Sequence, residues 1–171
     1  MTIHDINANE FNPYYKAYID KAEGLTLLDG LNSSGEDVHK LLEGISEEKA
    51  THRYAEGKWS IKELVQHIID VERIFAYRAL RISRGDVTAL AGFDQDDYIA
   101  AAHADERSFN DLIEEYKAVR SSTAALFKSF SSQQLKHIGT ASGSKVSVRA
   151  LGFIIIGHEI HHCNILQERY L

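Results

Sequence analysis

The chain has 171 residues, of which 44% are hydrophobic and 26% are charged. This length and composition predict a single domain over residues 1–171 with a packed core, and they exclude a disordered chain. The net charge of −6 and the lack of a basic stripe argue against binding to nucleic acid. No apolar run reaches the roughly 18 residues that a membrane-spanning helix needs, so we expect no contact with a membrane.

Residues 1–15 lack the charged-then-apolar pattern of a secretory signal. The single cysteine, Cys163, can form no internal disulfide, which is consistent with a reducing compartment. We therefore expect a cytoplasmic protein without a thiolate-rich zinc site.

Four apolar stripes with a spacing of three and four residues predict amphipathic helices. In chain order they cover residues 28–45, 60–78, 109–130 and 148–165. The sequence therefore predicts an all-α four-helix bundle.

Short signals around these stripes predict the remaining organisation. Ser60 and Glu63 fit a capping box at the start of the second helix. The glycine- and serine-containing segments 84–92 and 139–145 predict loops. Residues 1–23 are expected to form an N-terminal extension that packs on the bundle.

The connector between the second and third helices, residues 85–107, predicts the topology. It is longer than the 2–8 residues that usually join antiparallel neighbours. At ~3.3 Å per residue it can run back along a helix of ~35 Å, which allows the two helices to be parallel. The predicted order is up-down-down-up, with the second helix antiparallel to the fourth.

The most apolar segment, FIIIGHEIHHCNIL at residues 153–166, contains histidines at a ligand spacing. His158 and His162 lie four residues apart and share one helix face. His67 lies about seven residues from the start of its helix, and the midpoint of the other two lies about eight residues from the end of theirs, so antiparallel packing puts all three level. They could bind a divalent metal ion and leave coordination positions open. Alternatively, each is a core histidine that is hydrogen-bonded to a neighbour.

Other residues beside these histidines have two interpretations each. His161 lies off the stripe, either flanking the site or on the helix surface. Glu159 either orients a ligand or makes a surface ion pair. HEIHH also matches the H-E-x-x-H metalloprotease pattern, with Glu159 as general base, but only nine residues follow His162 to supply a downstream ligand. Cys163 lies off the stripe and is expected to be a buried, inert thiol.

Four further positions are candidates for a pocket. Trp59 and the connector segment FDQDDY (93–98) could line its mouth, although Trp59 could also be a core residue and the aspartates could cap a short helix. Arg78 and Arg149 lie on or beside inward stripes. Each could hold a substrate carboxylate or form a buried ion pair.

GKWSIKELVQHIIDVERIFAYRALRI, GFDQDDY and SVRALGFIIIGHEIHH together resemble the DinB-like (YfiT-like) metalloenzymes, over most of the chain. The resemblance implies an up-down-down-up four-helix bundle that holds a divalent metal ion with one histidine on the second helix and two on the fourth. At the matching positions these are His67, His158 and His162. Family members include thiol-dependent S-transferases that use bacillithiol and mycothiol-dependent isomerases.

These observations favour a metal-dependent S-transferase that joins a low-molecular-weight thiol to a small electrophilic molecule. A metal-dependent hydrolase and a non-catalytic metal-binding or dimerising bundle are the alternatives. Three imidazoles and water suit zinc, nickel, iron or manganese, with zinc or nickel expected first. The relatives often pair, and two-fold dimers are the commonest oligomers, so we expect a homodimer.

Overall fold

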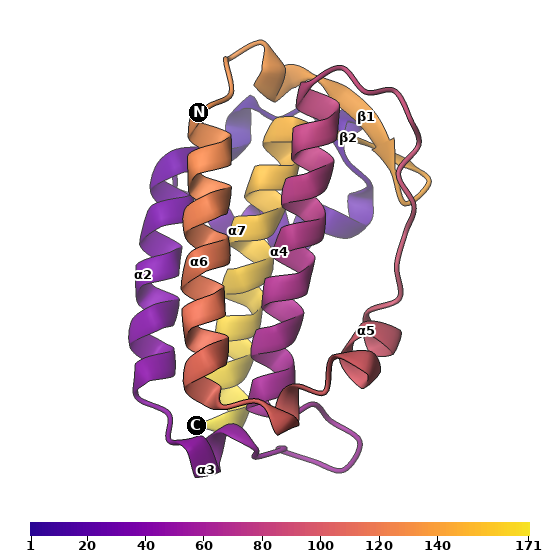
Figure 1. Cartoon of the computed structure of the whole chain (residues 1–171). Helices are drawn as coiled ribbons and strands as arrows, with labels where there is room; N and C mark the ends of the chain where they lie inside the picture. The colour runs from indigo at the N-terminus through magenta and orange to yellow at the C-terminus, as the bar shows by residue number, and fades with distance from the viewer.

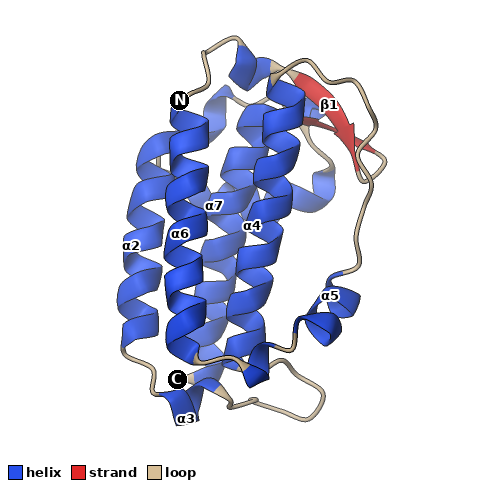
Figure 2. Ribbon diagram, in the orientation of Figure 1, coloured by secondary structure: helices blue, strands red, loops and turns tan.

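The computed structural model describes residues 1–171 and contains a bundle of four long helices (Figures 1 and 2). The helices of the bundle are α2 (Leu27–Glu43), α4 (Ile61–Ser83), α6 (Phe109–Lys128) and α7 (Val148–Ile165). Each apolar stripe of the sequence forms one of these helices, so the predicted four-helix bundle is confirmed.

Shorter elements join and extend the bundle. They are α1 (Lys16–Ile19), α3 (Glu47–Ala50), α5 (Gln95–Ala102), the strands β1 (Ile138–Ala141) and β2 (Ser144–Ser147), and a π-helical turn at Leu166–Tyr170. No helix combines the length and the apolarity that crossing a membrane would require.

The chain follows the predicted up-down-down-up order. In Figure 1 it descends through α2, ascends through α4, returns outside the bundle to the start of α6, ascends again and descends through α7. The returning connector carries α5, which packs against α4. The helices α4 and α7 are therefore antiparallel and in contact.

The start of α4 shows how the sequence sets a helix boundary. Ser60 is the N-cap, and its hydroxyl accepts a hydrogen bond from the backbone N–H of Glu63 at 3.1 Å. The Glu63 carboxylate accepts one from the backbone N–H of Ser60 at 2.8 Å. The predicted capping box is present, and it satisfies two backbone N–H groups that the helix itself leaves free.

The segment 139–145, expected to be a loop, belongs to a β-hairpin. β1 and β2 pair antiparallel, with Ile138 opposite Ser147. The two turn residues, Ser142 and Gly143, both have positive φ angles, of 50° and 74°. This turn geometry matches the right-handed twist of hairpin strands, which explains why four-residue strands form in an otherwise helical protein.

A polar layer divides the hydrophobic core of the bundle into two halves. One apolar half includes Phe75 and Phe127, and the other includes Leu64 and Leu112. Between them lie buried charged and imidazole side chains, namely Glu72, Arg120, Glu159, His67, His158 and His162. Charged groups are rarely buried without partners, so this layer is the first place to search for a functional site.

The N-terminal segment, residues 1–23, packs against α7 through α1 and the turn after it. Gly157 permits the closest approach, because a Cβ atom at this position would lie 1.7 Å from the Tyr18 carbonyl oxygen. At the start of α7, the guanidinium of Arg149 donates hydrogen bonds to the buried carboxylate of Glu10.

Candidate metal centre

Three histidines from α4 and α7 converge inside the bundle. The Nε2 atom of His158 lies 3.0 Å from Nε2 of His67 and 3.1 Å from Nε2 of His162. The potential ligand atoms of the three side chains all lie within 4.8 Å of one another. Antiparallel packing thus puts His67 level with two histidines about ninety residues later, and each ring is at most 9% exposed.

Burial keeps the three imidazoles neutral. Desolvation lowers the pKa of His67 to about 4. Desolvation and then the neighbouring histidines lower the pKa of His162 to about 3 and that of His158 well below its ordinary value. Neutral imidazoles have a free lone pair, which is the form that binds a metal ion.

The arrangement of ring nitrogens fits a metal ion better than mutual hydrogen bonding. A neutral ring nitrogen carries either one N–H or one lone pair, so Nε2 of His158 cannot hydrogen-bond well to both neighbours. A single cation can accept all three lone pairs. Nδ1 of His162 is buried without a hydrogen-bond partner, so no protein group fixes either tautomer of that ring. The donor set therefore fits a divalent ion.

The comparison with protein families supports this geometry. The model of the DinB superfamily matches residues 31–166, which include all three histidines and the four bundle helices except for the first turn of α2. The chain belongs to the DinB superfamily. No curated protein matches the sequence of this DinB-superfamily member.

Solved structures with the same fold include proteins of Bacillus subtilis. One is YfiT, which is described as a probable metal-dependent hydrolase with an unusual four-helix bundle topology. Its TM-score is 0.76 at 14% sequence identity, and the alignment covers 93% of this chain and 91% of YfiT. The DinB-like protein YjoA has a TM-score of 0.60 and 27% identity, covering 82% of this chain and 86% of YjoA.

A mycothiol-dependent maleylpyruvate isomerase also has this fold. The TM-score is 0.67 at 14% identity, and the alignment covers 95% of this chain but 62% of the isomerase. At this identity the likeness concerns the fold alone.

Aromatic rings surround the histidine cluster. The Trp59 ring centroid lies 4.8 Å from that of His67, and Tyr18 lies 5.5 Å from His158. His161 is half-buried beside the cluster, 5.0 Å from the His162 ring, and it is not one of the converging ligand atoms. Trp59 and His161 thus lie beside the cluster, and any part that they play in function stays a prediction.

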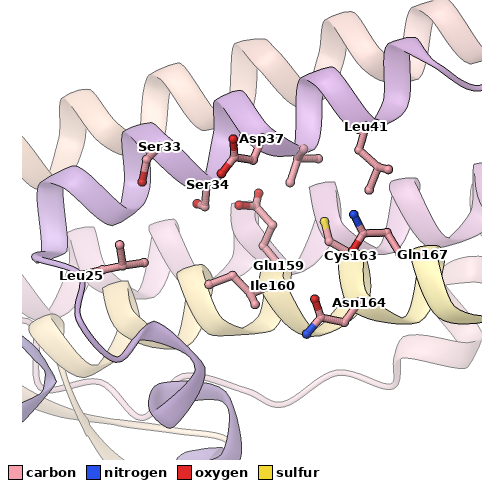
Figure 3. Close-up of a pocket in the computed structure, with 11 residues that line it drawn as sticks. Leu25, Ser33, Ser34, Asp37, Leu41, Glu159, Ile160, Cys163, Asn164 and Gln167 are labelled. Carbon is pink, nitrogen blue, oxygen red and sulfur yellow. The ribbon is translucent and has the colours of Figure 1, made fainter.

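Glu159 does not make a surface ion pair, which corrects one of its two expected roles. Its side chain is 1% exposed and accepts hydrogen bonds from the guanidinium of Arg120, at 2.9 and 2.5 Å, and from the hydroxyl of Tyr116. Figure 3 shows it pointing toward α2. Both carboxylate oxygens are engaged by protein groups, which disfavours a role for Glu159 as a general base.

Arg120 is the centre of a buried network that the sequence analysis missed. Its guanidinium also donates to the carboxylate of Glu72 at 2.7 to 3.2 Å and to the hydroxyl of Ser34 at 2.9 Å. The sequence contains only a weak signal that Arg120 is buried: it lies four residues, about one helical turn, after Tyr116, which belongs to an apolar stripe. Gly35 provides room, since a Cβ atom there would lie 2.9 Å from Cγ of Arg120.

The two arginines that were candidates for a pocket, Arg78 and Arg149, instead contact other segments of the chain and stabilise the fold. Arg149 pairs with Glu10, so the buried ion pair is present and the guanidinium is not free for a substrate carboxylate. Arg78 forms no ion pair with a carboxylate. It donates to the carbonyl of Ala91 at 2.8 Å and to the hydroxyl of Ser142 at 2.9 Å, which ties the connector and the hairpin to α4.

Cys163 is unsuited to be a ligand or nucleophile. Burial raises the pKa of its thiol to about 12. The side chain lines a cavity of about 250 Å³ between α2 and α7 that none of the three histidines reaches (Figure 3). Cys163 is half-buried, so the expectation of a fully buried thiol is not met.

Two further cavities reach the histidine cluster from different sides. The tyrosine cavity, of about 400 Å³, contains His158 and is lined by Tyr14, Tyr15, Tyr18, Val71, Phe75, Phe93, Asp94, Gln95, Asp96 and Ser142. The lysine cavity, of about 340 Å³, contains His162 and is lined by Tyr54, Gly57, Lys58, Trp59, Leu64, Asp96, Ile165 and Tyr170. Sequence reasoning identified Trp59 and the 93–98 segment but missed the tyrosines, whose only signal is the aromatic run PYYKAY in the N-terminal segment.

Proposed function

We propose that this protein is a metal-dependent enzyme that joins a low-molecular-weight thiol, through its sulfur atom, to a small electrophilic molecule. The observation that carries the proposal is the convergence of three buried, neutral imidazoles at a point that two cavities reach. A purely structural metal site would be closed by a fourth protein ligand. His67, His158 and His162 are the proposed ligands, and they leave positions open for reactants.

The protein groups support thiol chemistry at this point. A bound divalent ion would lower the pKa of a coordinated thiol and so supply a thiolate at neutral pH. In the transfer, the sulfur forms a bond to the electrophilic carbon, the leaving group departs with the electrons of the bond that breaks, and the thiol proton passes to solvent. Cys163 is poorly suited to provide the sulfur, because desolvation raises the pKa of its thiol to about 12 and the cavity that it lines contains none of the three histidines. The thiol must therefore be a small molecule that enters through a cavity.

The ligand set also bears on the metal. Three imidazoles with open positions suit zinc or nickel first, and iron or manganese less well, since those metals accept carboxylate oxygens more readily. A reducing, cytoplasmic location is part of the proposal, because free thiols persist there.

Metal-assisted hydrolysis is the second candidate. The description of YfiT as a probable metal-dependent hydrolase favours it. The version in which Glu159 is the general base is not supported, because Arg120 and Tyr116 engage that carboxylate. Hydrolysis would require a metal-bound hydroxide or another base. The two cavities also argue against a non-catalytic bundle, which has no need of access to the ion.

The proposal is tested by elemental analysis of purified wild type, His67→Ala and His161→Ala. We expect about one divalent ion per chain in wild type and in His161→Ala, and almost none in His67→Ala. A screen of several small thiols with electrophilic acceptors should then show metal-dependent transfer. Ester hydrolysis without thiol dependence would instead favour the hydrolase. Full metal content in His67→Ala would contradict the site itself.

A further inference from the structure

We infer that the tyrosine and lysine cavities are separate sites for the two reactants, with a carboxylate-bearing thiol in the lysine cavity and an uncharged, flat electrophile in the tyrosine cavity. This inference rests on the proposed thiol transfer. It adds which reactant lies on which side of the histidine cluster.

The first observation is the way in which the cavities divide the cluster. His158 lines the tyrosine cavity and His162 lines the lysine cavity. Asp96 of α5 is the one residue that lines both, so the cavities adjoin there. Two molecules can therefore approach the cluster, one beside His158 and one beside His162, without competing for one channel. A transfer reaction gains most when both reactants are held next to each other.

The second observation is the charge of the linings. The tyrosine cavity is lined by Asp94 and Asp96 and by no lysine or arginine, and the Arg78 guanidinium, which lies over the Phe75 and Phe93 rings of the lining, offsets only one of these two carboxylates. A negatively charged reactant would be repelled there. The lysine cavity is lined by Lys58 in addition to Asp96. Some small biological thiols, cysteine and glutathione among them, carry a free carboxylate, and the lysine cavity suits a thiol of that class better.

The third observation is the shape and chemistry of the tyrosine cavity. Tyr14, Tyr15 and Tyr18 form one wall, and Phe75 and Phe93 contribute to the rest. Aromatic side chains favour stacking or edge contacts with flat apolar groups, and tyrosine hydroxyls can donate hydrogen bonds to a carbonyl. This lining fits an uncharged aromatic or conjugated electrophile.

Much of this wall comes from the N-terminal segment, which precedes the region matched by the family model, residues 31–166. Tyr18 is held beside His158 by the close contact of its backbone with Gly157. This wall of the electrophile site therefore lies outside the region matched by the family model, whereas the metal ligands lie inside it.

The thiol assignment is tested with cobalt-loaded protein titrated with 3-mercaptopropionate and, as the uncharged control, 2-mercaptoethanol. Binding is measured by the sulfur-to-cobalt absorption band, which requires no turnover. Lys58→Gln and Gln95→Glu form a matched pair, since both residues are exposed and each change lowers the charge of one cavity lining by one unit. We expect the dissociation constant of 3-mercaptopropionate to rise about threefold or more in Lys58→Gln and less than about twofold in Gln95→Glu.

The control thiol should bind equally to all three proteins. A larger effect of Gln95→Glu than of Lys58→Gln, or equal effects, would overturn the assignment of the thiol to the lysine cavity while leaving thiol activation in place. Absence of the absorption band with both thiols in wild type would overturn the proposed function, and the inference with it.

The electrophile assignment is tested with benzamide as an uncharged aromatic probe, by saturation-transfer nuclear magnetic resonance. We expect a signal in wild type that persists with saturating 3-mercaptopropionate and disappears in Gln95→Trp, which fills the tyrosine cavity. A signal lost on adding the thiol would overturn the two-site arrangement. No signal in wild type, or a full signal in Gln95→Trp, would overturn the place assigned to the electrophile.

Discussion

Replacing Gly157 with alanine should destabilise the protein, although alanine is the better helix former. The added Cβ would lie 1.7 Å from the carbonyl oxygen of Tyr18 and 2.4 Å from the carbonyl carbon. Both are backbone atoms, so no rotation of a side chain relieves the clash. A normal carbon–oxygen contact is about 3.3 Å. The N-terminal segment must therefore move by about 1.5 Å or lose its packing on α7.

The size of the effect follows from two opposing contributions. Glycine to alanine inside a helix gains about 1 kcal/mol. Overpacking costs about 1–3 kcal/mol, and partial loss of the burial of Ile19 and Ala22 adds to it. We expect a net loss of about 1–2 kcal/mol and, for a domain of this size, a melting temperature lower by about 2–8 °C.

Urea and thermal unfolding of Gly157→Ala are compared with those of Gly30→Ala. Gly30 is also buried in a helix, but its added Cβ meets the tip of the Ile156 side chain, which can rotate away. We expect the Gly30 variant to be near wild type or more stable. Metal content should be unchanged in both, because the ligands are on bundle helices. A Gly157 variant as stable as the Gly30 variant would refute the close approach of the N-terminal segment.

Three other predictions concern the ion, the pH dependence and the assembly. His158→Leu should no longer bind one metal ion per chain but should still unfold cooperatively, at a similar or higher temperature, since a buried leucine contributes on the order of 2 kcal/mol. If circular dichroism showed that the variant is unfolded, the metal site would be structural. Desolvation raises the pKa of Glu10, but hydrogen bonds from Arg149 and Asn7 outweigh it and lower the pKa to about 2. The ion pair therefore contributes up to about 3 kcal/mol of stability above pH 4.5, and this contribution is lost as the pH falls toward 2. In urea unfolding, Glu10→Gln should lack this part of the dependence of the unfolding free energy on pH. The same pH dependence in wild type and variant would argue against the ion pair. The homodimer should give about twice the chain mass of 19.2 kDa in light scattering, and a monomer at every concentration would exclude it.

The bundle was predictable because its signals are local. The capping box of Ser60 and Glu63 and the spacing of apolar residues depend on neighbours within one or two turns. The meeting of His67 with His158 was also predictable, because the length of a connector restricts which helices can be antiparallel neighbours.

The remaining features depend on partners that are distant in the sequence. Arg120 meets Glu72 and Glu159 at separations of 48 and 39 residues, and no local pattern distinguishes it from a solvated arginine. The hairpin consists of four-residue strands, too short for an alternating pattern to stand out. The tyrosine wall comes from a segment of short turns, where aromatic residues have no periodicity that indicates the surface they cover.

The buried arginine network has a consequence for how the metal site is maintained. Through its guanidinium, Arg120 of α6 contacts Leu31 and Ser34 of α2, Glu72 of α4 and Glu159 of α7, so one side chain joins all four helices. Sliding any helix by one turn, about 5.4 Å, would leave a buried charge without its partner in a low-dielectric interior. The axial register of α4 against α7 is therefore locked independently of the ion. The three imidazoles are held at coordinating distance before an ion arrives, and metal exchange can proceed without rearrangement of the helices.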